Sequence, residues 1–159
     1  MSNLDRRSFF SSGICGALAM AALPSSPAVA KTTDGEKANI KAVRDWSAAF
    51  DTVAASDPPD LTKLVPYFSV DCAFRLRPTD TAPQYGVDAV AATIKRVTAN
   101  GQKVHQVLLD SFARGPVVVM EKLNHFVTPE KTRTSHVVAV YVFKDGKIVE
   151  WTEYFITVA

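Results

Sequence analysis

The second half of the chain contains four consecutive segments with the composition of β-strands, and this arrangement constrains the fold most strongly. The segments are rich in β-branched and aromatic residues and span about residues 103–112, 116–127, 134–143 and 147–157. The last two are separated by Asp145-Gly146, a pair typical of a two-residue hairpin turn. Four such segments with short connections predict a sheet whose successive strands pair in antiparallel fashion.

Mainly helical segments precede this sheet. Apolar residues recur at helical spacing in most of them and alternate with polar residues in the strand. The expected elements are a helix over residues 36–56 capped by Thr33 or Asp34, a short helix over 60–67, a strand over 72–77 and a helix over 86–100. Helices first and strands last are typical of an α+β fold. We therefore expect a cone, in which a curved antiparallel or mixed sheet wraps around N-terminal helices.

The aromatic residues of this pattern supply candidate core positions, and the open end of such a cone supplies a candidate pocket. The side chains expected in the core are Trp46, Phe50, Phe68 and Phe112. Ligand pockets form preferentially in mouths of this kind. The sequence therefore directs attention to side chains on the inner face of the sheet.

The first thirty residues have the features of an export signal. Arg6-Arg7 precedes Ser-Phe-Phe, the apolar stretch 13–23 is too short to span a bilayer, and Ala28-Val29-Ala30 resembles a cleavage site. We predict a twin-arginine signal peptide over 1–30 and a single domain over 31–159, exported folded and periplasmic or secreted. An amphipathic first helix and a retained N-terminal anchor are the alternatives.

Charge and residue spacing exclude several classes of function. A net charge of +2, without a basic cluster, argues against a nucleic-acid partner, and no apolar run is long enough for a stable membrane span. Cys72 would be the single cysteine after cleavage, so no internal disulfide is expected. The sequence contains neither metal-ligand spacing nor a phosphate-binding glycine loop or nucleophile elbow. We therefore expect no metal and no cofactor.

Three local sequences, together with the order of elements, resemble the nuclear transport factor 2-like superfamily. They are Tyr67–Asp71, Tyr85–Val90 and Asp145–Phe155. Within this superfamily the chain resembles the limonene-1,2-epoxide hydrolase family over about residues 38–157, with polyketide cyclases and ketosteroid isomerases as more distant relatives. The resemblance implies the cone fold, a homodimer that pairs through the outer sheet face, and cofactor-free addition of water to a small apolar epoxide.

Five polar positions of that family carry different residues here. The Arg and Asp of one strand correspond to Lys122 and Asn124, the Asp of the last strand to Glu153, and the Tyr and Asn of the first strand to Phe74 and Leu76. The resemblance implies that Glu153 is the general base and that Lys122 and Asn124 polarise the reacting groups. Lys122 is also an alternative proton donor, because the amide of Asn124 cannot supply a proton. We expect weak epoxide hydrolysis from this set.

Strand alternation places the remaining candidates on the same faces as these residues. The expected substrate contacts are Phe74, Leu76, Met120, Phe126 and Trp151, and His125 falls on the opposite face. Lys122 and Glu153 also fit a purely structural buried ion pair. The alternatives to an epoxide hydrolase are therefore a binding module for a small apolar ligand, an isomerase or lyase that uses the same residues, and an interaction domain.

Overall fold

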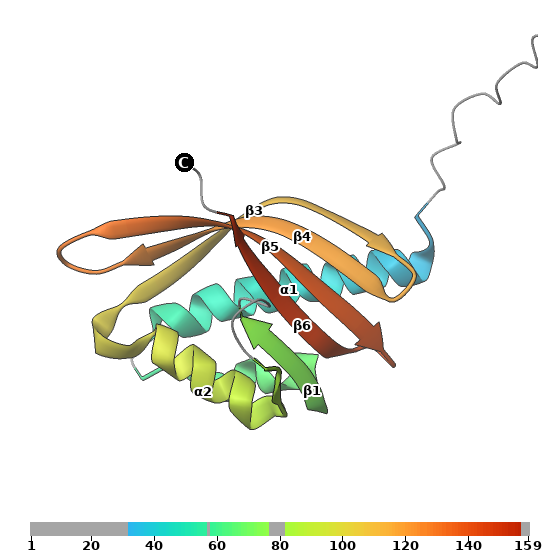
Figure 1. Ribbon diagram of the computed structural model, residues 1–159, viewed down its shortest axis with the longest axis horizontal. Coiled ribbons are helices and arrows are strands. Elements are labelled where there is room, and N and C mark those ends of the chain that lie inside the picture. Colours follow the sequence, from blue (N-terminus) through green and yellow to red (C-terminus); the bar gives the residue numbers. More distant parts are fainter. Residues whose placement is uncertain (1–31, 57, 77–81, 157–159) are drawn as a thin grey trace, which may run out of the picture. The chain divides into compact units, whose positions relative to one another are not determined.

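The order of elements along the chain agrees with the α+β prediction (Figure 1). The computed structural model describes residues 32–56, 58–76 and 82–156, and the predicted signal peptide lies outside them. The helical elements are α1 (Asp34–Ala55), η1 (Leu61–Lys63), η2 (Val65–Tyr67), α2 (Val87–Val97) and η3 (Ala99–Gly101). The strands are β1 (Phe68–Leu76), β2 (Gln84–Tyr85), β3 (Lys103–Arg114), β4 (Val117–Val127), β5 (Thr132–Lys144) and β6 (Lys147–Ile156).

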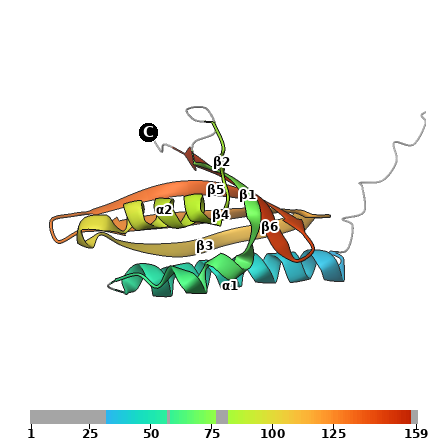
Figure 2. The ribbon, with the colours of Figure 1, turned by 90° about the horizontal axis from the view of Figure 1, so that it is seen from below.

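The described strands form one curved, mixed sheet in the order β2-β1-β6-β5-β4-β3. Consecutive strands from β3 to β6 pair in antiparallel fashion, whereas β1 pairs with β6 in parallel. Helix α1 packs against β3 and β4, and α2 packs against β1 and β2 (Figures 1 and 2). The helices thus enclose the inner face of the sheet, which makes this the cone fold that the sequence predicted.

Helix α1 begins with a capping box and supplies the centre of the core. The Thr33 side chain accepts from the backbone N–H of Glu36, whose carboxylate accepts from the backbone N–H of Thr33. Successive turns of α1 each bury an apolar side chain, and Trp46 is fully buried. Its ring centroid lies 4.8 Å from that of Trp151 and 5.8 Å from that of Phe68. The core roles predicted for Trp46, Phe50 and Phe68 are therefore confirmed.

One local prediction is confirmed in a different helical form, and another was wrong. The expected helix over 60–67 is a pair of 3₁₀ turns, in keeping with Pro66, which has no N–H to continue an α-helical ladder. Phe112 is 59% exposed rather than buried. A bulge between Leu108 and Asp110 adds one residue to β3 and reverses which alternate positions face inward. The side chain that simple alternation places in the core therefore points outward.

The turn of the β5–β6 hairpin is the two-residue turn that the sequence predicted. Asp145 and Gly146 have φ values of 50° and 73°, which a two-residue turn between right-twisted strands requires. A bulge between Val142 and Phe143 then shifts the pairing by one residue, so that Ala139 faces Glu153 and Val137 faces Phe155. None of the helices in the described ranges is long and apolar enough to cross a membrane.

Candidate functional site

A buried ion pair joins two strands that are not neighbours. The Nζ atom of Lys122, on β4, lies 2.7 Å from the Oε1 atom of Glu153, on β6. The side chains of Lys122 and Glu153 are 0% and 5% exposed. Strand β5 lies between them, with Val137 facing Lys122 and Ala139 facing Glu153. The lysine side chain is long enough to reach across one strand, and the small Ala139 leaves room beside it.

Trp46 lies beside this pair. The Lys122 ammonium lies 5.5 Å from the centroid of the Trp46 ring, within the range of a cation–π contact. Beyond the ion pair, Lys122 Nζ has no hydrogen-bond partner among the described residues. Because an isolated buried charge is very costly, the charges of Lys122 and Glu153 stabilise each other in the interior.

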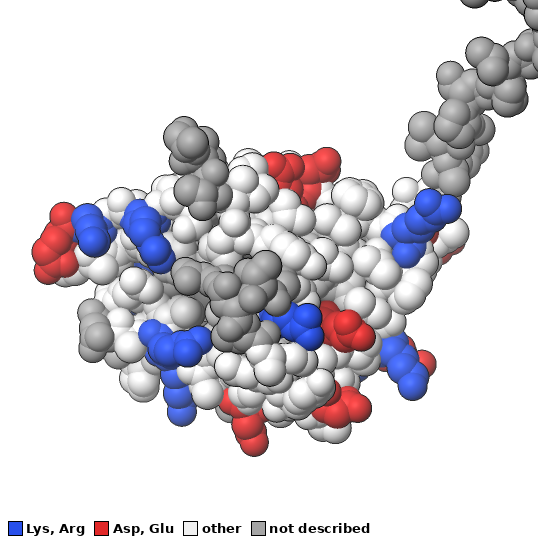
Figure 3. Space-filling model, viewed as in Figure 1, with Lys and Arg blue, Asp and Glu red and all other residues white. Residues whose placement is uncertain are grey.

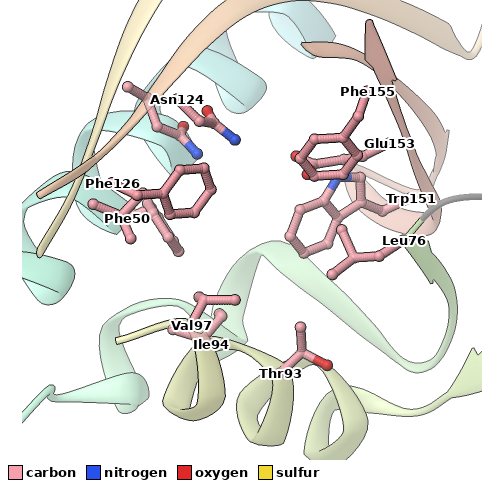
Figure 4. Close-up of a pocket in the computed structure, with 12 residues that line it drawn as sticks. Phe50, Leu76, Thr93, Ile94, Val97, Asn124, Phe126, Trp151, Glu153 and Phe155 are labelled. Carbon is pink, nitrogen blue, oxygen red and sulfur yellow. The ribbon is translucent and has the colours of Figure 1, made fainter. Parts of the chain in front are cut away.

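Glu153 also lines a pocket at the inner face of the sheet (Figure 4). The volume of the cavity is about 50 Å³, several times what one water molecule requires. Its wall is mostly apolar, and its polar side chains are Thr93, Gln106, Asn124 and Glu153. The apolar lining residues are Phe50, Leu76, Ile94, Val97, Val104, Phe126, Trp151 and Phe155.

The structure brings most of the candidate residues to this pocket. Leu76, Asn124, Phe126, Trp151 and Glu153 all contribute to its wall. Strand β4 supplies two of them and β6 supplies two, so the inward positions of both strands converge on one cavity. The alternation that the sequence predicted for these strands is therefore present in the fold.

Three candidates lie beneath the wall instead of in it. Lys122, Met120 and Phe74 are at most 1% exposed and do not line the pocket. Met120 accepts a weak contact from Ser47 Oγ at 3.7 Å, and the ring of Phe74 lies 4.5 Å from that of Trp151. These side chains support the residues that do line the cavity.

Sequence reasoning missed Gln106, which faces Asn124 directly in the β3–β4 ladder. Gln106 is 8% exposed, and its position has the same parity as the inward-facing Val104. That parity was the available signal. A glutamine in an amphipathic strand is more often a surface residue, so parity alone does not assign Gln106 to a pocket.

Burial suppresses ionisation of two further inner-face groups. It raises the pKa of the Tyr141 hydroxyl, an effect to which the negative charge of Glu153 adds. It raises the pKa of the Cys72 thiol to about 12, with smaller contributions from Asp71 and Glu150. A thiol that stays protonated is a poor nucleophile, so Cys72 is not a candidate for covalent catalysis.

The histidines lie away from the pocket. His105 pairs with Asp51 at 2.8 Å, His136 with Glu121 at 2.6 Å, and the Nδ1 of His125 lies 2.8 Å from the Thr134 hydroxyl. His125 alternates with Asn124 and lies on the opposite face of β4, as predicted. Within the described ranges, no group of three or more His, Cys, Asp or Glu side chains is placed to hold a metal ion.

Charged side chains of both signs are interspersed on the face of the molecule seen in Figure 3. No continuous basic surface appears on this face. The chemistry that stands out is therefore internal: one carboxylate with a buried counter-cation, in an otherwise apolar pocket.

A family model for the SnoaL-like domain matches residues 43–151, which is more than half of the chain. The chain belongs to the SnoaL-like domain family. A search of curated proteins finds no match. The predicted nuclear transport factor 2-like cone fold is confirmed by the solved structures that share it, and the assignment to the limonene-1,2-epoxide hydrolase family stays a prediction.

Several solved structures share the fold of this SnoaL-like domain at low sequence identity. An epoxide hydrolase of the limonene-epoxide-hydrolase type from M. tuberculosis is 17% identical, with 77% of this chain and 85% of that chain covered and a TM-score of 0.63. A protein described as a SnoaL-like polyketide cyclase, from Jannaschia sp. CCS1, is 12% identical, with 79% and 90% covered and a TM-score of 0.68. A nuclear transport factor 2-like protein from Anabaena variabilis is 15% identical, with 81% and 97% covered and a TM-score of 0.68.

Proposed function

We propose that this SnoaL-like protein is a cofactor-free enzyme that adds water to a small apolar epoxide by acid/base catalysis. The observation that carries the proposal is the position of Glu153. Its carboxylate lines a mostly apolar pocket and is paired with the fully buried Lys122. A carboxylate in such a place is suited to act as a base.

In the proposed reaction Glu153 takes a proton from a water molecule as the water oxygen attacks an epoxide carbon. The carbon–oxygen bond of the epoxide breaks, and its electron pair stays on the ring oxygen. Asn124 donates an N–H hydrogen bond to that oxygen as charge develops on it. The proton held by Glu153 then passes to the opened oxygen, so that the product is a diol and Glu153 is again ionised.

Lys122 has a positioning role in this scheme. It lies 2.7 Å from Glu153 but does not line the pocket, so it acts on the base and not on the substrate. This favours ion pairing over the alternative in which Lys122 donates a proton to the epoxide. The similarity to an epoxide hydrolase at 17% identity supports the fold and leaves the reaction to be tested.

A binding module for a small apolar ligand is the second candidate. It is favoured by the mainly apolar wall of the pocket, and by Phe74 and Leu76, which stand where the resembled family has groups that hold water. An isomerase or lyase that uses Glu153 as its base is a third candidate on the same fold.

The purified protein should be tested with styrene oxide, cyclohexene oxide and limonene oxide, with diol formation as the readout. The proposal predicts turnover by the parent and none by Glu153→Gln, whose side chain has nearly the same shape. Glu150→Gln is the matched control, because Glu150 is an exposed carboxylate on the same strand. A folded parent that binds but does not convert these epoxides would favour the binding module.

We also propose export by the twin-arginine route, on the basis of the Arg6-Arg7 sequence and the apolar stretch that follows it. A reporter protein fused to residues 1–30 should reach the periplasm. Replacing both arginines with lysine should retain it in the cytoplasm. Equal export of the two fusions would contradict the twin-arginine prediction.

We also propose that the protein forms a homodimer through the outer face of the sheet. Phe112, Tyr154 and Ile156 alternate with inward-facing positions of β3 and β6 and are 59%, 47% and 43% exposed. Exposed apolar side chains on one sheet face are typical of interaction surfaces. Light scattering should give the mass of a dimer for the parent and of a monomer for Phe112→Glu, and a monomeric parent would contradict the proposal.

A further inference from the structure

Two carboxamide side chains meet on the pocket wall. Gln106 on β3 and Asn124 on β4 are directly opposite each other in the antiparallel ladder, and both line the cavity. Gln106 is 8% exposed and Asn124 is 4% exposed, so both residues are buried although they line the pocket. Cross-strand neighbours on one face are close enough for both side chains to reach a single atom of a ligand.

The carbonyl oxygens of both carboxamides are buried and so do not face the cavity. The carbonyl oxygens of Gln106 and Asn124 have no hydrogen-bond partner among the described residues. A carbonyl oxygen only accepts, so the groups of these two side chains that are able to bond an oxygen atom of a ligand are the amide N–H groups. Figure 4 shows Asn124 on the opposite side of the cavity from Glu153.

We propose that Gln106 and Asn124 together form a two-donor site for one oxygen atom of the ligand. A carboxamide supplies N–H donors, and a carbonyl or epoxide oxygen accepts two hydrogen bonds through its two lone pairs. The ionised Glu153 carboxylate only accepts, so it does not compete for that oxygen. The ligand oxygen therefore lies against the β3–β4 wall, and its hydrocarbon part lies among the apolar residues of β6 and α2.

This makes Gln106 the residue that determines specificity for an oxygen-bearing ligand over a hydrocarbon of the same shape. A site with buried polar groups discriminates strongly against a ligand that leaves those groups unbonded. The inference rests on the proposed small-molecule pocket, but it does not require turnover. It extends the ligand class from epoxides to small ketones and aldehydes.

The test compares two ligands that differ in a single group, cyclohexanone and methylenecyclohexane, neither of which is an epoxide. Their dissociation constants are measured by NMR titration of the ¹⁵N-labelled protein. Two hydrogen bonds to the ketone oxygen predict an affinity preference of about tenfold or more. The side-chain NH₂ signals of Gln106 and Asn124 should move with cyclohexanone and stay in place with methylenecyclohexane.

Gln106→Met retains the size of the side chain and removes its donor. The ketone preference should fall by about threefold or more, with no loss of affinity for methylenecyclohexane. Gln84→Met is the matched control, because it makes the same change at an exposed glutamine of β2 that does not line the pocket, and it should leave the preference unchanged. Thermal unfolding of each variant verifies that it is folded.

Equal affinity for the two ligands in the parent would overturn the inference, as would a ketone preference that Gln106→Met leaves intact. Failure of both ligands to bind would overturn the inference together with the pocket. Selective binding of cyclohexanone without hydrolysis of any epoxide would support the two-donor site and contradict the proposed enzyme. The two proposals therefore fail in different experiments.

Discussion

Each face of the sheet carries a short contact between a carboxylate and a basic side chain, and one member of each pair lies on β4. On the inner face, Lys122 and Glu153 are 2.7 Å apart and at most 5% exposed. On the outer face, His136 and Glu121 are 2.6 Å apart, and their side chains are 24% and 42% exposed. The distances are nearly equal, so the difference between the pairs lies in their surroundings. Solvent screens the outer pair, whereas the inner pair depends on its two members for stabilisation.

The largest effect is expected from removal of the inner cation. Lys122→Met leaves Glu153 as an unpaired carboxylate in an apolar interior, and the free energy of unfolding should fall by about 3–5 kcal/mol. Chemical denaturation measures this difference. A loss below about 1 kcal/mol would show that the pair is solvated despite its burial.

Replacing both partners should sharpen the comparison. In the double variant Lys122→Met/Glu153→Leu no charge is left unpaired, so much of the stability lost in Lys122→Met should return. Activity should stay absent, because the base has been removed. A double variant less stable than Lys122→Met would instead mean that the ion pair itself organises the core.

Alkaline pH should lower the free energy of unfolding because of two buried groups on the inner face, Cys72 and Tyr141. In the unfolded chain the Cys72 thiol ionises near its ordinary pKa of 9.0, whereas burial holds its pKa at about 12 in the folded protein. The unfolded state therefore releases its proton first, and stability falls as the pH rises above 9. Burial also raises the pKa of Tyr141, which adds to this loss above its ordinary value of 10.0.

Denaturation at a series of pH values measures the slope, and Cys72→Ala is the control. The variant should lose less stability between pH 9 and 11 than the parent does. Identical slopes for the two proteins would show that Cys72 ionises equally easily in the folded and unfolded chains.

The smallest effect is expected at the outer pair. Glu121→Gln removes a partly exposed carboxylate and should lower the free energy of unfolding by less than about 1 kcal/mol. Salt at about 1 M should reduce even this difference, because charges at the surface are screened over about 3 Å. A loss comparable to that of Lys122→Met would contradict the comparison.

Much of the fold follows from local pattern. The Asp145-Gly146 turn and the alternation of β4 each fix a local geometry that the chain adopts without long-range help. Thr33 caps α1 for the same reason. Phe112 was misplaced because the bulge that reverses its direction arises from pairing between β3 and β4, which a single strand does not reveal.

The candidate site was only partly accessible from the sequence. Parity placed Lys122 and Asn124 on one face, but the contact between Lys122 and Glu153 also requires the strand order β4-β5-β6 and the small Ala139. The register between β3 and β4 places Gln106 directly opposite Asn124, a pairing that the parity of β3 alone does not give. Residues joined by non-local pairing are those that a linear pattern leaves undetermined.

A single turnover of cyclohexene oxide in H₂¹⁸O, with the protein in excess, tests the central claim that Glu153 activates water most directly. In the proposed mechanism the water oxygen attacks the epoxide, so the diol should carry ¹⁸O and Glu153 should remain unlabelled. Absence of diol, or ¹⁸O found in the Glu153 carboxylate after an unlabelled diol is released, would contradict the account.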